Sequence, residues 1–165
     1  MNLEKQMSDL NRDSVVKQAV VFDGDQVRDA WTKSKLSHLQ FISTNKSYRA
    51  LPKSVWDQIL AEHLSIHKYV PEFFDCDSFA AALMGLVAYD FEINGICRVL
   101  DISGHHSYNA VLVCDDGTTC SWLRVEPQAD LFLEDIAKRG QLTAGVSVTS
   151  PDGAYAATSG FAVTA

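Results

Sequence analysis

The sequence predicts a single α+β domain in which two helices precede a run of antiparallel strands. Apolar residues recur at helical spacing over 55–67 and again over 76–89. The residues that follow form short apolar or alternating stretches, as strands do, at 93–102, 108–114 and 119–125. A block of helices followed by a block of strands is typical of α+β proteins.

The composition is that of a soluble globular protein. The chain has 165 residues, of which 47% are hydrophobic and 21% charged. A chain of this length is long enough to bury a core. Its net charge of -7 argues against nucleic acid as a partner, because binding phosphates needs a surplus of lysine and arginine. No apolar run approaches the length that spans a bilayer, and residues 1–12 lack the apolar core of a signal peptide. We therefore expect a cytoplasmic protein without a membrane partner, in the host cytoplasm if it is viral.

The four cysteines show no metal-binding or disulfide-framework spacing. They are Cys76, Cys97, Cys114 and Cys120. We expect reduced thiols, as in a cytosolic protein. One disulfide stays open as an alternative, because Cys114 and Cys120 flank a predicted turn.

The other elements follow in order. Residues 1–36 are polar and charged, and we expect a helical or partly irregular lead-in. A short strand is predicted at 37–43 and a loop at 45–52. Ser54 is placed to cap the first helix, and Asp75 or Cys76 begins the second.

The C-terminal part combines turn signals with weaker patterns. Asp115–Thr118 predicts a hairpin turn, and residues 130–139 predict a short helix. The tail adds a hairpin or covers an edge of the sheet. We divide the chain into the lead-in 1–36, a catalytic domain 37–140, and a strand or hairpin extension 141–165 packed on the same domain.

Cys76 is the candidate nucleophile because it begins an apolar helix. The unpaired N–H groups and positive dipole end of a helix N-terminus stabilise a thiolate and receive the oxyanion of a tetrahedral intermediate. Asp75 and Asp77 oppose this, since neighbouring carboxylates raise the pKa of a thiol. They are compatible with a reactive thiol if their side chains cap the helix or point to solvent. Taken alone, a cysteine on an apolar helix stripe is more often a core residue.

His106 opens an apolar strand and Glu126 closes the next one, which supplies a base and an orienting carboxylate. A two-residue turn between the strands puts Glu126 opposite Ser107, on the face away from His106. A three-residue turn puts Glu126 opposite Tyr108, on the face that His106 shares. The spacing therefore permits a triad with Cys76.

Three motifs in this order carry a resemblance to a known family. They are Asp75–Ala80 (DCDSFA), His106–Asn109 (HSYN) after a glycine, and Glu126–Gln128 (EPQ). Together they resemble the papain-like cysteine protease domain of the fairy-ring mushroom agglutinin and of related small phage and bacterial proteins. The resemblance covers residues 74–130, roughly a third of the chain.

The resemblance implies a role for each motif. Cys76 would be the nucleophile, His106 the base and Glu126 its orienting carboxylate. The implied fold is papain-like, with the helix that carries the cysteine packed on a small antiparallel sheet that carries the histidine and the glutamate. No cofactor is required, although the fungal enzyme depends on calcium, and Asp75 and Asp77 are the possible ligands.

Three further polar residues belong to the predicted site. His105 is an alternative base, but the Tyr-Asn spacing favours its neighbour His106. Gln58 on the preceding helix is a candidate oxyanion donor, although a glutamine on a helix is more often a surface residue. Asn109 is a candidate supporting residue that hydrogen-bonds near the site.

The sequence thus predicts a cysteine peptidase, a hydrolase that cleaves peptide or isopeptide bonds in a peptide or protein substrate. The alternative is a catalytically inactive papain-like module that binds a partner or builds a phage or bacterial assembly. A third possibility is a peptidoglycan peptidase or an acyl transferase, because a thioester can be resolved by water or by an amine.

Overall fold

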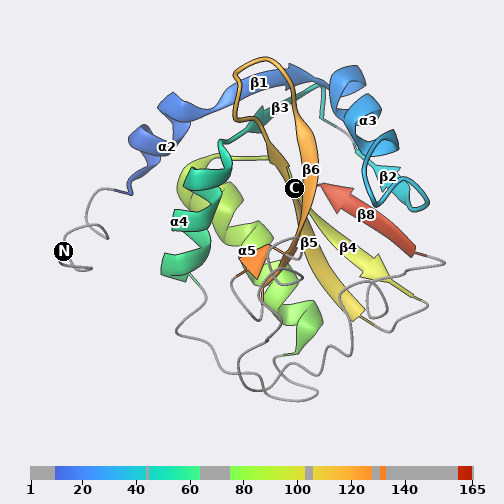
Figure 1. The fold of residues 1–165 in the computed structure, drawn as a ribbon. Helices are drawn as coiled ribbons and strands as arrows, with labels where there is room; N and C mark the ends of the chain where they lie inside the picture. The colour runs from blue at the N-terminus through green and yellow to red at the C-terminus, as the bar shows by residue number, and fades with distance from the viewer. Residues whose placement is uncertain are drawn as a thin grey trace.

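The computed structural model describes residues 10–43, 45–63, 75–102, 106–127, 131–132 and 160–164. The elements in order are α2 (Arg12–Gln18), β1 (Val20–Asp23), α3 (Gly24–Thr32), β2 (Gln40–Ile42), β3 (Ser47–Ala50), α4 (Lys53–His63), α5 (Cys76–Phe91), β4 (Ile96–Asp101), β5 (His106–Val113), β6 (Ser121–Glu126), β7 (Leu131–Phe132) and β8 (Gly160–Thr164). The predicted α+β class is confirmed (Figure 1). No helix in these described segments is long and apolar enough to span a membrane.

Two sheets organise the described residues. The larger has the strand order β2-β8-β4-β5-β6-β7, and all its neighbours are antiparallel except the parallel pair β2 and β8. The smaller pairs β1 with β3. A bridge between Leu51 and Val113 and a hydrogen bond from the Arg49 amide to the Asn94 side chain, 2.9 Å, connect the two sheets.

One face of the large sheet is covered by α4 and α5 (Figure 1). Phe79, Leu83 and Val87 form a buried stripe on α5, as their helical spacing predicts. They pack with Trp56 from α4 and with strand residues that alternate toward this face, such as Val111. Asp75 caps α5 by accepting hydrogen bonds from the amides of the first helical turn, so the predicted second helix is confirmed at its start.

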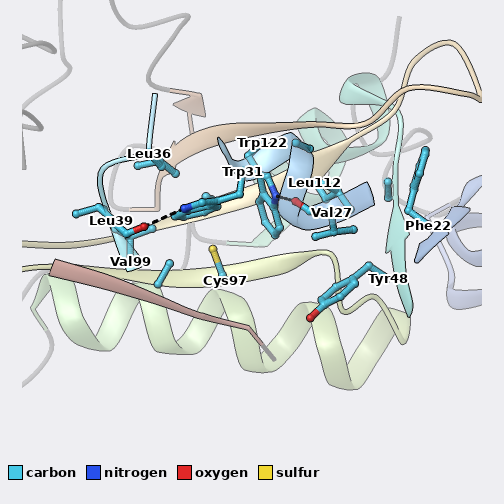
Figure 2. Close-up of a cluster of buried hydrophobic side chains, with 14 of the residues drawn as sticks. Phe22, Val27, Trp31, Leu36, Leu39, Tyr48, Cys97, Val99, Leu112 and Trp122 are labelled. Carbon is cyan, nitrogen blue, oxygen red and sulfur yellow. Dashed lines mark hydrogen bonds between the residues drawn. The ribbon is translucent and has the colours of Figure 1, made fainter. Parts of the chain in front are cut away.

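The opposite face is covered by α3. Trp31 stacks on Phe41 with ring centroids 4.8 Å apart and meets Trp122 edge to face at 5.6 Å. The indole of Trp31 donates to the Leu39 carbonyl at 3.0 Å, and that of Trp122 donates to the Val27 carbonyl at 3.2 Å (Figure 2). Both buried indole N–H groups are therefore satisfied within this core.

The N-terminal segment is more ordered than its polar composition predicts. Residues 12–32 form helix, strand and helix, and each of the two helices is capped by a capping box. Val15, Val27 and Trp31 are buried, so α2 and α3 each supply part of a core. Their apolar residues are few but lie on one side of each helix.

Three local predictions differ from the structure. The expected loop at 45–52 contains β3, which pairs with β1. The helix predicted at 55–67 is α4, which begins at Lys53. The Lys53 amide donates to the Asp115 carboxylate at 2.7 Å, so Ser54 lies inside the helix and is not its cap. Leu131–Phe132, expected in a helix, pairs with β6 as β7, and residues 133–139 lie outside the described residues. In the tail, β8 lies between β2 and β4.

Candidate functional site

A hollow of about 320 Å³ lies where α5 begins, β4 ends and β5 begins. Its lining residues are Asp75, Cys76, Asp77, Leu100, Asp101, Ile102 and His106. The sheet register pairs Asp101 directly with His106, so the end of β4 and the start of β5 form one wall. The first turn of α5 forms the other wall. The structure therefore brings Cys76 and His106 to the same hollow.

Glu126 lies behind His106 rather than in the hollow. It is fully buried, and its Oε2 lies 2.9 Å from His106 Nε2. Asn109 pairs with Val125 across the hairpin, and continuing this register places Glu126 opposite Tyr108. This is the register that the longer turn predicts. The carboxylate thus fixes the orientation of the imidazole, whose ring also stacks on Tyr108 with centroids 5.9 Å apart.

The two carboxylates beside Cys76 are both engaged. Asp75 Oδ1 accepts from the amides of Asp77 and Ser78 at 3.2 and 3.5 Å. Asp77 Oδ1 lies 3.0 Å from Arg98 Nη2, on the neighbouring strand β4. One acid therefore caps the helix and the other is held by a cation.

The thiol of Cys76 is half-buried, and burial raises its pKa above the ordinary value. The Asp77 and Asp75 carboxylates add to this increase, while hydrogen bonds from the backbone amides of Ser107 and Asp77 partly offset it. The net direction is a pKa above the ordinary value. The helix N-terminus does not by itself make Cys76 a thiolate.

The other predicted residues are not brought to the hollow. Gln58 is exposed on α4 and does not line it. Asn109 is buried between α5 and β4, where its amide nitrogen donates to the Ala80 carbonyl at 2.9 Å and the Cys97 carbonyl at 3.2 Å. It therefore ties the helix to the sheet. His105 lies outside the described residues.

Sequence reasoning missed most of what β4 contributes to this site. Leu100, Asp101 and Ile102 line the hollow, and Arg98 holds Asp77 while donating to Ser107 Oγ at 3.1 Å. A charged residue in the middle of a mostly apolar strand was the available signal for Arg98. Arg98 reaches Asp77 and Ser107 because β4 pairs with β5, and the motifs do not predict that pairing.

Asp75 and Asp77 do not by themselves fit calcium, which needs about six to eight oxygen ligands. Both carboxylates already have the partners described above. In the segments that the structure describes, no group of three or more histidine, cysteine or acidic side chains is placed to hold a metal ion.

No family model matches the sequence, and no curated protein matches it. Solved structures do match. One, described as the "PSL1a-E64 complex", aligns with a TM-score of 0.55 and 23% identity over 70% of this chain and 47% of that chain. Another is the Polyporus squamosus lectin bound to the human-type influenza-binding epitope Neu5Acα2-6Galβ1-4GlcNAc, with a TM-score of 0.55 and 20% identity over 88% of this chain and 50% of that chain. The chain spans about half the length of each.

Both similar structures are those of a lectin, and neither is described as a protease. The resemblance to a papain-like cysteine protease domain, inferred from short motifs, is therefore wrong. The hydrolase function, the assignment as an enzyme with a catalytic triad and the peptide or protein substrate are corrected with it. The peptidoglycan peptidase and the acyl transferase also gain no support. This chain is similar in fold to part of the Polyporus squamosus lectin.

Proposed function

We propose that the chain is a non-catalytic binding module and that the hollow at Cys76 holds a carbohydrate. The observation that carries this proposal is the mixture of side chains around the hollow, which combines carboxylates, an imidazole and the apolar Leu100 and Ile102. Carboxylates and imidazole accept hydrogen bonds from sugar hydroxyls, and apolar side chains pack on the C–H faces of a sugar ring. The trisaccharide bound by the similar lectin supports the same ligand class.

The direction of the Cys76 pKa supports binding rather than hydrolysis. A nucleophilic thiol must be deprotonated, and the pKa of this one is raised by burial and by two carboxylates. We also propose that the packing of α5 on the β4–β5–β6 strands serves binding. Its support is the placement of Cys76 at the helix start and of His106 and Glu126 on the strands.

Cys76 is expected to react with iodoacetamide more slowly than free cysteine at neutral pH. The rate should increase as the pH rises above the usual range for thiols, because only the thiolate attacks and the pKa is raised. Intact mass and peptide mapping over a pH series measure this rate. The His106→Ala variant is the control and should label at a similar rate. Labelling of Cys76 faster than free cysteine, and slowed in that variant, contradicts a non-catalytic site.

Isothermal titration calorimetry of the purified chain with Galβ1-4GlcNAc tests the carbohydrate proposal. We expect this neutral disaccharide to bind more tightly than the sialylated trisaccharide, because the acidic side chains repel a sugar carboxylate. Ile102→Ala should weaken binding about five- to tenfold by removing apolar contact. Ile42→Ala is the matched control, since Ile42 is also exposed but lies on β2 away from the hollow.

Two results would contradict the proposal in different ways. The absence of binding heat with either sugar at millimolar concentration removes the carbohydrate assignment. Incubation with E64, the compound named with PSL1a in the other similar structure, tests the non-catalytic assignment separately. A mass increase that persists after removal of free E64 and maps to Cys76 would show a reactive thiol.

A further inference from the structure

Cys114 and Cys120 face each other at the turn end of the β5–β6 hairpin. The register pairs Val113 with Ser121, so the next facing pair is Cys114 and Cys120. Directly opposed residues project to the same face of a sheet, which brings the two side chains together. Both thiols are free, and this end of β5 is opposite to the end at His106.

The backbone hydrogen bonds define what kind of pair this is. The amide of Leu112 donates to the Gly95 carbonyl at 2.7 Å, and that of Cys114 donates to the Leu51 carbonyl at 2.9 Å. Both amides therefore point away from β6, which makes Cys114 and Cys120 a non-hydrogen-bonded pair. In such pairs the Cα atoms are closest, about 4.5 Å apart. This separation falls within the range of roughly 4.4–6.8 Å that a disulfide spans.

The turn between the two cysteines is held in place by its own contacts. Asp116 Oδ1 accepts from the amides of Thr118 at 2.8 Å and Thr119 at 2.7 Å. These bonds lower the pKa of Asp116 to about 2, so the carboxylate stays ionised and the turn stays formed at neutral pH. Gly117 takes the positive φ of 74° that the turn requires. The register is thus fixed before any bond joins the cysteines.

We propose that Cys114 and Cys120 are a disulfide-forming site that closes by exchange with a low-molecular-weight disulfide such as glutathione disulfide. The thiolate of Cys120, the more exposed of the two, attacks glutathione disulfide and releases one glutathione thiolate. The thiolate of Cys114 then attacks Sγ of Cys120 and expels the second glutathione thiolate. Two protons leave the cysteines, the protein is oxidised by two electrons, and glutathione disulfide is reduced to two thiols.

The surroundings indicate a bond that forms slowly and then persists. Burial raises the pKa of both thiols, and the neighbouring Cys114 raises that of Cys120 further. Few thiolates are therefore present to start the exchange at neutral pH, which makes closure faster at alkaline pH. Thiols of high pKa are also poor leaving groups, so the closed disulfide resists reduction. The pair suits a structural cross-link better than a rapid redox sensor.

The other cysteines are not placed to compete. Cys97 is fully buried in β4, and its pKa is raised far above the ordinary value by burial. Cys76 lies beside Ser107, at the opposite end of β5 from Cys114. The proposed site is therefore selective for one pair.

The test is incubation of the reduced full chain with glutathione disulfide at mildly alkaline pH, followed by intact mass and non-reducing peptide mapping. Wild type is expected to lose two hydrogen atoms, to retain no glutathione and to yield one cross-linked peptide pair, Cys114 with Cys120. Cys114→Ser should stop at a mixed disulfide on Cys120. Cys76→Ser is the matched control and should close as wild type does.

The closed form should also melt at a higher temperature than the reduced form, because the cross-link restricts the unfolded chain. Glutathione retained on Cys120 of the wild type would overturn the proposal. So would cross-linking between chains, or a Cys114 thiol that stays free while Cys120 reacts. These outcomes do not depend on whether the hollow binds sugar.

Discussion

Replacing Gly95 with alanine is expected to lower the free energy of unfolding by about 3 kcal/mol or more. A Cβ at this position would overlap the Arg49 carbonyl oxygen and lie 3.2 Å from Leu112 Cβ. Neither neighbour moves easily. The Arg49 amide, in β3, donates to the Asn94 side chain between α5 and β4, and the Leu112 amide donates to the carbonyl of Gly95 itself. Urea denaturation monitored by circular dichroism measures the loss.

Gly85→Ala is the matched control, because it makes the same glycine-to-alanine change at another position. Gly85 lies inside α5, and a Cβ there would meet nothing within 4 Å. Alanine has the better helix propensity, so this variant should gain about 0.5–1 kcal/mol. Similar losses in both variants would contradict the proposed close approach between the two sheets at Gly95.

Trp31→Ala is expected to destabilise the protein by about 3–5 kcal/mol. The side chain is 3% exposed, stacks on Phe41, meets Trp122 edge to face and donates a hydrogen bond to the Leu39 carbonyl. Truncation removes all of these contacts and leaves a cavity between α3 and the sheet. Circular dichroism during chemical denaturation is the suitable measurement, because tryptophan fluorescence changes with the substitution itself.

Trp31→Phe separates the packing of this ring from its hydrogen bond. Phenylalanine keeps an aromatic ring against Phe41 but cannot donate to Leu39, so a smaller loss of about 1–2 kcal/mol is expected. A loss below about 1 kcal/mol in the alanine variant would mean that α3 does not stabilise the fold.

The parts of the fold that the sequence predicts best are those with strong local signals. The second helix combines a capping aspartate with an unbroken apolar stripe, and it begins at Cys76 as expected. The hairpin turn at 115–118 is likewise predicted by its composition. Its length decides whether Glu126 shares a face with His106, and the observed register is one of the two that the sequence allowed.

Other elements depend on contacts between distant segments. β3 exists because it pairs with β1, and its residues Ser47–Ala50 carry no strong strand pattern of their own. Leu131–Phe132 belongs to a stretch with helical spacing, yet pairing with β6 makes it a strand. α3 has only three buried apolar side chains, and the strands against which they pack come much later in the sequence.

The sequence predicted some of the residues at the candidate site but not all of them. The order of Cys76, His106 and Glu126 matched a spatial arrangement that the structure contains, with the first two on one hollow and the third bonded to the second. The orienting role of Arg98 and the lining by Asp101 come from β4, which no motif included. Short motifs do not fix chemistry, because the protonation of a thiol depends on burial and on neighbours that tertiary structure supplies.

The position of β8 has a consequence for how the chain folds. The strands β4, β5 and β6 are neighbours in sequence and can assemble early, as hairpins with short connections do. β2 has no such route, because in the large sheet it pairs with β8, which comes more than a hundred residues later. Closing so long a loop costs entropy before any contact compensates for it. We therefore expect the β2–β8 side of the sheet to form last, which would leave the edge of β4 in a partly folded chain open to pair with another molecule.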